Sequence, residues 1–150
     1  MKYNELRVLA EKYNVRLIYL FGSQAEQGKR YLEGENAVRG DVSDLDIAVD
    51  IDVSSREAIE TYGILFRELS RIFDPFAVDL TIMHEVNPLL RHEIIKGLRI
   101  YERDMSYADD VEERIMKIAE DLSFKKKILN DEIMEAMEHG YFEFEYRPNP

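Results

Sequence analysis

The sequence lacks cysteine, long apolar runs and linker-like stretches rich in proline or serine. Without cysteine the chain forms neither disulfides nor thiolate metal sites. No apolar stretch approaches the ~20 residues needed to cross a bilayer, and the charged N-terminal residues are not followed by the apolar core of a signal peptide. We therefore expect a cytoplasmic protein that folds as one domain and does not enter a membrane.

Basic charge is also scarce. The 150 residues include 31 acidic and 20 basic side chains, which gives a formal net charge of −11. Proteins that grip nucleic acid neutralise its phosphates with clustered lysine and arginine, so we expect no direct binding to nucleic acid. An acidic chain suits a small nucleotide held through a metal ion, or a basic protein partner. The hydrophobic fraction of 45% is enough for a folded core.

Helical and strand patterns alternate along the chain. Apolar residues at helical spacing predict helices, and apolar runs or strict alternation predict strands. The expected helices are 2–13, 54–73, 87–96 and 108–139, and the expected strands are 15–21, 44–51, 76–83 and 99–102. This order predicts the α/β (α+β) class, a small mixed sheet flanked by helices. We expect residues 1–105 to form the sheet domain and 106–150, a long helix and tail, to pack on it.

Residues 28–43 interrupt the alternation. This segment contains three glycines among several charged residues, a composition typical of a loop. Loops of this length in compact domains are usually either functional or disordered. We expect a loop here, either a lid whose basic residues meet a ligand or a disordered insertion.

Two aspartates, Asp44 and Asp46, stand two residues apart in the second expected strand. Residues two apart in a strand point to the same face, with their Cα atoms ~7 Å apart. Two like charges so placed repel unless a cation lies between them, and Mg²⁺ commonly binds one or two carboxylates together with substrate phosphates. Such a pair is also common on solvent-facing strands with no function. Asp50 and Asp52 share its parity, and we interpret them as the solvated end of the strand.

Asp79 is a third candidate, because it interrupts an otherwise apolar strand. A buried carboxylate without a partner is costly. If its strand lies beside the strand of Asp44 and Asp46, three carboxylates come together, and such a set can hold two metal ions ~3.5–4 Å apart for phosphoryl or nucleotidyl transfer. The alternative is that Asp79 forms an ion pair with an arginine.

Gly22 and Ser23 follow directly on the first buried strand. Glycine lets the chain turn and lets backbone approach a ligand, and a hydroxyl at a helix N-terminus lies where free N–H groups favour phosphate. Ser23 could equally be an N-cap residue only. The dipeptide alone carries little information, but its order before the three aspartates is much more specific.

In this order the chain resembles the polymerase β-like nucleotidyltransferase superfamily, and within it the minimal nucleotidyltransferase (MNT) antitoxins. The segments that match are Phe21-Gly22-Ser23-Gln24-Ala25, Ser43-Asp44-Leu45-Asp46-Ile47-Ala48-Val49 and Val78-Asp79-Leu80. The resemblance covers about 15–102 and implies the nucleotidyltransferase fold. One departure is that the family's usual arginine after Gly-Ser is absent, since Gln24 and Glu26 occupy that turn.

The resemblance also implies roles. Asp44, Asp46 and Asp79 would be the catalytic residues and would bind two Mg²⁺ ions, with Asp79 helping to activate the acceptor hydroxyl. Gly22 and Ser23 would hold the phosphates of ATP. The reaction would transfer AMP to a hydroxyl, a tyrosine of a partner toxin with a HEPN domain. The alternatives are an antitoxin that acts by binding alone and an aminoglycoside-type nucleotidyltransferase.

The C-terminal third leaves a second question open. The apolar stripe of the last expected helix is interrupted by Lys126. The helix either packs on its own sheet or offers a surface to a partner or to a second copy, so a homo-oligomer is possible. Aromatic residues alternate with glutamates in 141–146, and this tail either docks back on the core or adds a strand to a partner.

Overall fold

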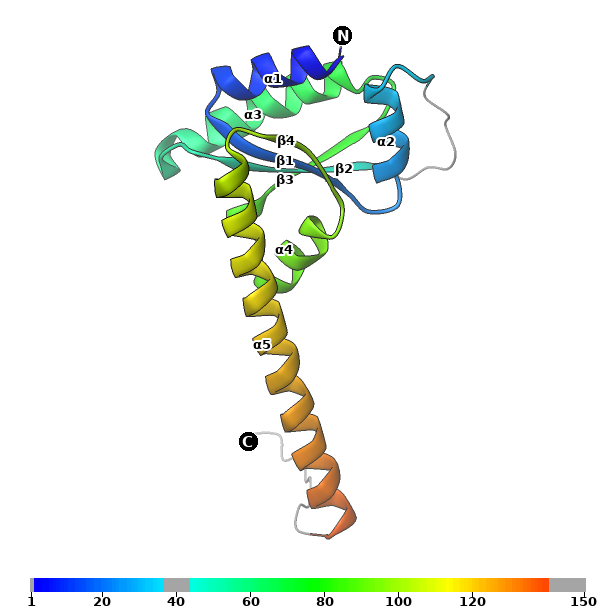
Figure 1. The fold of residues 1–150 in the computed structure, drawn as a ribbon, viewed down its shortest axis with the longest axis vertical. Helices are drawn as coiled ribbons and strands as arrows, with labels where there is room; N and C mark the ends of the chain where they lie inside the picture. Colours follow the sequence, from blue (N-terminus) through cyan, green and yellow to red (C-terminus); the bar gives the residue numbers. More distant parts are fainter. Residues whose placement is uncertain (1, 37–43, 141–150) are drawn as a thin grey trace, which may run out of the picture.

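The computed structural model describes residues 2–36 and 44–140 of the chain (Figure 1). A four-stranded sheet is flanked by helices, which confirms the expected class. The elements are, in order, α1 (Lys2–Lys12), β1 (Val15–Phe21), α2 (Ala25–Leu32), β2 (Leu45–Ile51), α3 (Ser55–Ile72), β3 (Val78–Ile82), the short 3₁₀ helix η1 (Met83–Glu85), α4 (Pro88–Ile95), β4 (Leu98–Glu102) and α5 (Met105–Glu138).

The strands lie in the order β3-β2-β1-β4. β1 pairs antiparallel with both β2 and β4, whereas β2 and β3 are parallel. The parallel pair is joined by α3, a crossover helix of the kind that such a connection requires. The sheet is therefore mixed, as predicted.

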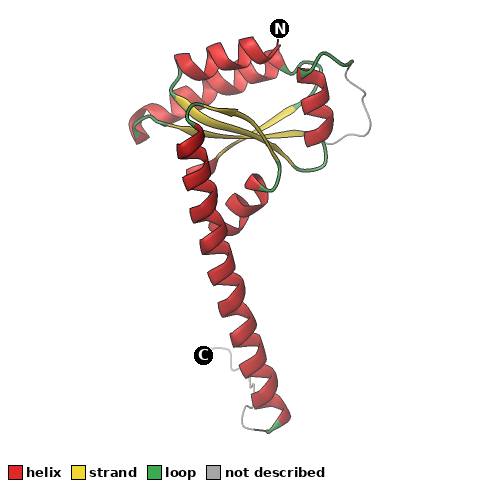
Figure 2. Ribbon diagram, in the orientation of Figure 1, coloured by secondary structure: helices red, strands yellow, loops and turns green. Residues whose placement is uncertain are grey.

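Helices cover both faces of the sheet (Figures 1 and 2). α1 and α3 lie on one face, and α4 and the first part of α5 lie on the other. Alternation along β2 divides its side chains between the two faces. Leu45, Ile47, Val49 and Ile51 belong to the larger core cluster, which includes α1 and α3 residues, and Ala48 belongs to the smaller cluster with α4 and α5.

The loop expected over 28–43 begins later than predicted, because α2 continues to Leu32. Gly28 lies inside this helix and is buried. A Cβ at this position would stand 2.8 Å from Cδ1 of Leu45 and 3.0 Å from Cδ1 of Leu20, so glycine lets α2 press closely on the sheet. The last part of the expected loop, 37–43, lies outside the described residues, as does the aromatic tail, 141–150.

α5 is a 34-residue helix that extends well beyond the sheet (Figure 1). The side chain of Asp104 caps the N-terminus of α5 and accepts hydrogen bonds from the backbone N–H groups of Ser106 and Tyr107. Only Ala108, Ile115 and Ala119 of this helix are buried. These buried residues lie in the first half of α5, while the division of the chain at 105 and the packing of 106–150 as a unit stay predictions. Within the described residues, no helix is both long and apolar enough to span a membrane.

Candidate active site

The strand ends bring the predicted aspartates to one edge of the sheet. Phe21, the last residue of β1, lies opposite Asp46 near the start of β2. Asp46 in turn lies opposite Asp79 near the start of β3. The end of one antiparallel strand thus meets the beginnings of two parallel ones, and the turn at Gly22 follows directly.

Asp46 and Asp79 are direct neighbours across the parallel pair. Burial raises the pKa of the Asp46 carboxyl, and the charge of Asp79, a hydrogen bond to Asp79 and the charge of Asp44 raise it further. Two carboxylates held this close repel each other, and a bound cation or a proton relieves the repulsion. The condition under which Asp79 could join the pair, that its strand lies beside the strand of Asp44 and Asp46, is met by this register.

Asp44 lies just before β2 rather than within it, and its side chain is exposed. Among the described residues, no group of three or more His, Cys, Asp or Glu side chains is arranged to hold a metal ion. Two carboxylates completed by substrate phosphates are nevertheless an ordinary Mg²⁺ set. The donors present therefore fit a Mg²⁺ ion that arrives with a nucleotide, and Asp46 and Asp79 are the pair that would hold it.

Gly22 lies directly against the carboxylate of Asp46. Its φ is +75°, a left-handed conformation that side chains other than glycine rarely adopt. A Cβ built on Gly22 would lie 2.3 Å from Oδ2 of Asp46 and 3.3 Å from its Cγ. Any larger residue would displace the carboxylate, so the backbone turn and the acid occupy adjoining space.

Ser23 lies on the surface beside this turn and is exposed. The N-cap of α2 is Gln24, and no side chain caps this helix end. The interpretation of Ser23 as an N-cap residue is therefore wrong. Its hydroxyl is left accessible next to the Gly22 turn, where a ligand phosphate would need a donor.

Asp50 corrects another expectation. It is not solvated but buried, with 6% of its surface exposed. Oδ1 accepts a hydrogen bond from the Arg16 guanidinium at 2.8 Å, and Oδ2 accepts one from the Tyr107 hydroxyl at 2.5 Å. Sequence parity placed Asp50 on the same face as Asp46, but the packing of α5 over this end of the strand could not be seen in the sequence.

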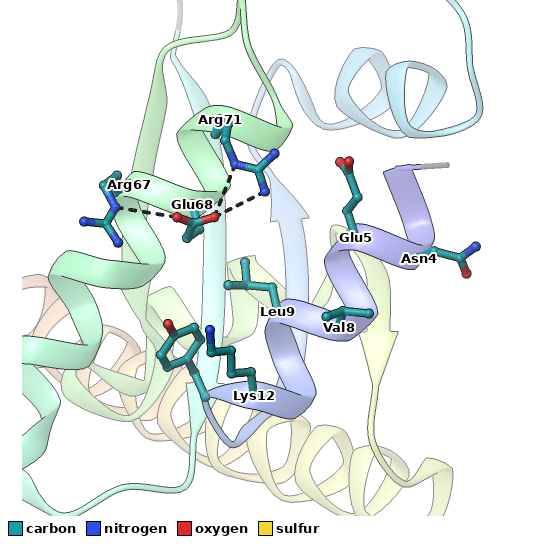
Figure 3. Close-up of a pocket in the computed structure, with 9 residues that line it drawn as sticks. Asn4, Glu5, Val8, Leu9, Lys12, Arg67, Glu68 and Arg71 are labelled. Carbon is teal, nitrogen blue, oxygen red and sulfur yellow. Dashed lines mark hydrogen bonds and ion pairs between the residues drawn. The ribbon is translucent and has the colours of Figure 1, made fainter.

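A cavity lies elsewhere, between α1 and α3 on the other face of the sheet (Figure 3). Its volume is about 460 Å³. Glu68 is held there by Arg67 and Arg71, so the basic side chains on that wall are already engaged. At the carboxylate edge, Gly22, Ser23, Asp44 and Asp79 are exposed.

Comparison with known proteins agrees with this geometry. The model of the family described as "Polymerase beta, Nucleotidyltransferase" matches residues 4–106. No curated protein sequence matches the chain.

Several solved structures have the same fold. The crystal structure of a mutant of the toxin–antitoxin MntA-HpeT, with two Asp-to-Glu changes two residues apart, is 18% identical with a TM-score of 0.62; the match covers 89% of this chain and 99% of that chain. A crystal structure of the toxin–antitoxin with AMP-PNP is 19% identical with a TM-score of 0.60, over the same shares.

A third similar structure is the tri-AMPylated HEPN toxin of Shewanella oneidensis in complex with its MNT antitoxin. It is 18% identical with a TM-score of 0.55, and the match covers 89% of this chain and 96% of that chain. At these identities the likeness establishes a shared fold, while the family model covers more than half of the chain. The chain therefore belongs to the polymerase beta nucleotidyltransferase family, and it is a nucleotidyltransferase.

Proposed function

We propose that this protein transfers AMP from ATP to a tyrosine hydroxyl of a HEPN-type toxin and so inactivates it, in a Mg²⁺-dependent reaction. The observation that carries the proposal is the Asp46–Asp79 pair next to the Gly22 turn: the two aspartates are neighbours across the strands, beside the exposed Gly22 and Ser23. The acidic net charge of −11 also suits a basic ribonuclease partner.

The relatives supply the substrate class. One similar structure contains AMP-PNP, an ATP analogue, and another contains a HEPN toxin that has been AMPylated three times in complex with an MNT antitoxin. These facts belong to those proteins. For this chain they make ATP and a HEPN-type toxin the first substrates to test.

The chain's own residues suggest how the reaction would proceed. The acceptor oxygen forms a bond to the α-phosphorus while the bond from that phosphorus to pyrophosphate breaks, and the hydroxyl proton passes to the carboxylate of Asp79. Gly22 and Ser23 would bind the leaving phosphates through backbone and hydroxyl groups. When bound, Mg²⁺ would supply positive charge against the phosphates and the two carboxylates.

The test uses ATP labelled on the α-phosphate, Mg²⁺, the full chain and a purified HEPN-type toxin. We expect label on a toxin tyrosine, no label after chelation of the metal, and none with Asp46→Asn. Asp52→Asn is the matched control, because Asp52 is an exposed acid that directly follows the far end of β2. Label that persists in Asp46→Asn, or an unlabelled toxin under every condition, would reject the proposal.

The same variant separates the proposal from the binding-only alternative. If the chain neutralises the toxin by association alone, the Asp46→Asn variant still protects cells that express the toxin. If chemistry is needed, protection is lost while complex formation, measured by co-purification, is retained. Nucleotidylation of an aminoglycoside in place of the toxin would favour the small-molecule alternative.

A further inference from the structure

The distal half of α5 contacts little of the described chain. From Glu120 to Glu138 every residue is exposed except Ala136, which is half-buried. In Figure 1 this half of the helix runs away from the sheet and from α4. Its large apolar side chains are between 38% and 65% exposed: Leu122, Phe124, Ile128, Leu129, Ile133, Met134 and Met137.

Such a segment needs a partner to be stable. About 19 residues of helix are ~28 Å long, and isolated helices of this size are marginal in water, since most helical stability in proteins comes from packing an apolar face. Single exposed apolar residues are ordinary, but a continuous row of them marks an interaction surface.

The row itself limits what can cover it. At 100° per residue, four of these seven side chains share one stripe of the helix with Ile118 and Lys126. The stripe is Ile118, Leu122, Lys126, Leu129, Ile133 and Met137. The intervals along this stripe are four, four, three, four and four residues, so they read the same in both directions. A second copy of the stripe laid antiparallel therefore meets the first in register, with its midpoint between Lys126 and Leu129.

In that register Leu122 of one copy faces Ile133 of the other, and Ile118 faces Met137. Lys126, the one polar member, faces Leu129, so its charge is drawn to the edge of the seam by its flexible stem. A single polar position in an apolar seam favours one register over others.

The charges beside the stripe support the same arrangement. Lys125 and Glu132 lie on the same flank, seven residues apart. In the antiparallel register they come within two residues, ~3 Å, of the same axial level on opposite helices. The two-fold symmetry makes this pair twice, whereas a parallel pairing in register would place Lys126 beside Lys126 within the seam.

We propose that the distal half of α5 is a homodimerisation surface, on which two copies of this chain pair their helices antiparallel about a two-fold axis between Lys126 and Leu129. The overlap spans the segment that the sheet domain leaves uncovered, so the two domains lie at opposite ends of the paired helices. Each dimer then presents two carboxylate edges, which face separate acceptor molecules.

The absence of cysteine makes the register directly testable. Leu122→Cys and Ile133→Cys are prepared as separate full-length variants, mixed and oxidised. Facing seam positions reach disulfide distance, 4.4–6.8 Å between Cα atoms, but each variant's own two cysteines stand ~16 Å apart along the axis. We expect a disulfide-linked dimer in the mixture and little from either variant alone.

The matched control is a mixture of Glu120→Cys and Glu135→Cys. These residues share an axial level in the same register but lie on the outer side of the helix, so they should not cross-link. If each of Leu122→Cys and Ile133→Cys cross-links alone as readily as in the mixture, the helices are not paired in this way and the proposal fails.

Mass in solution gives the second test. By light scattering we expect twice the 17.7 kDa of one chain, and a return to 17.7 kDa in Leu122→Asp with Ile133→Asp. The outer-face control, Glu120→Ala with Glu135→Ala, should keep the dimer. A wild-type chain that stays monomeric, or cysteines at 122 and 133 that cross-link only to an added toxin, would overturn the proposal and assign the surface to that partner.

Discussion

The two ends of β2 carry the same residue in opposite surroundings. Asp46 and Asp50 lie on the same face of the strand, four residues apart. Asp50 is buried, and its carboxylate is matched by the Arg16 guanidinium and the Tyr107 hydroxyl. Asp46 is partly exposed and faces Asp79 across the parallel pair, and its pKa is raised by burial and by its acidic neighbours.

The difference separates a structural acid from a functional one. The fold supplies the counter-charge of Asp50, so removing this acid leaves a cation unmatched. Within the described residues 2–36 and 44–140 it supplies none for Asp46, so this part of the protein holds an unfavourable pair that a cation or a proton would relieve. Polar groups that are costly to the fold commonly mark the working part of a site. Substitution of Asp46 should therefore lower activity without lowering stability, and substitution of Asp50 should lower stability without lowering activity.

The largest expected effect is on activity. Asp46→Asn should lower AMP transfer by ~10³-fold or more, the order of loss seen when a group that stabilises transition-state charge is removed, while the melting temperature stays the same or rises. The assay is labelled transfer with a thermal melt of the same sample. A variant that loses activity together with fold would show that Asp46 is structural and would break the comparison.

Asp50→Ala should have the opposite profile. Removal of one partner of a buried ion pair typically costs ~3 kcal/mol or more, which lowers the melting temperature of a chain of this size by about 6–12 °C. Circular dichroism measures the melt, and transfer is assayed well below it. Asp52→Ala is the control, since the Asp52 side chain is 59% exposed and its removal should cost less than ~1 kcal/mol.

Asp79→Asn tests the repulsion directly. In the metal-free protein at neutral pH we expect a rise of ~2–4 °C in melting temperature, which corresponds to about 1 kcal/mol at this size. The raised pKa of Asp46 makes the native wild type gain stability as pH falls through that pKa. The advantage of Asp79→Asn should therefore shrink on acidification, and a constant or growing advantage would contradict the repulsion.

The sequence could predict the strands and their faces because alternation is a local signal. It predicted that Asp46 and Asp79 would meet only on condition that their strands are adjacent, since strand order depends on the whole chain. It misjudged Gly28, which looks like a loop residue until the nearby side chains of Leu45 and Leu20 explain the missing Cβ.

The surroundings of Asp50 could not be predicted either, because they also depend on contacts between distant parts of the chain. Its hydrogen-bond donor Tyr107 lies 57 residues away along the chain, and only the packing of α5 on the sheet brings the two together. Asp44 shows the limit of strand boundaries: the sequence placed it in the strand, and the structure places it one residue before. The role of Gly22, which leaves room for the Asp46 carboxylate, is clear only from the structure, because a Cβ at this position would collide with Oδ2 of Asp46.

The smallest expected effect concerns the hydrogen bond between Tyr107 and Asp50. Burial and the hydrogen bond to Asp50 raise the pKa of Tyr107 to about 12, so its hydroxyl stays a donor through the physiological range. Tyr107→Phe should lower the free energy of unfolding by ~0.5–1 kcal/mol, the lower part of the range for one hydrogen bond, because the Arg16 guanidinium still matches Asp50. AMP transfer should not change.

The sign of the pH dependence follows from the same shift. A tyrosine whose pKa is higher in the folded than in the unfolded chain contributes stability that is complete below pH ~10 and is lost as the pH rises toward 12. Urea unfolding at pH 7 and at increasing alkaline pH should therefore show the wild type losing its advantage over Tyr107→Phe in that interval. An advantage that is constant across it would mean that Tyr107 acts by packing alone, and that Asp50 is matched by Arg16 without it.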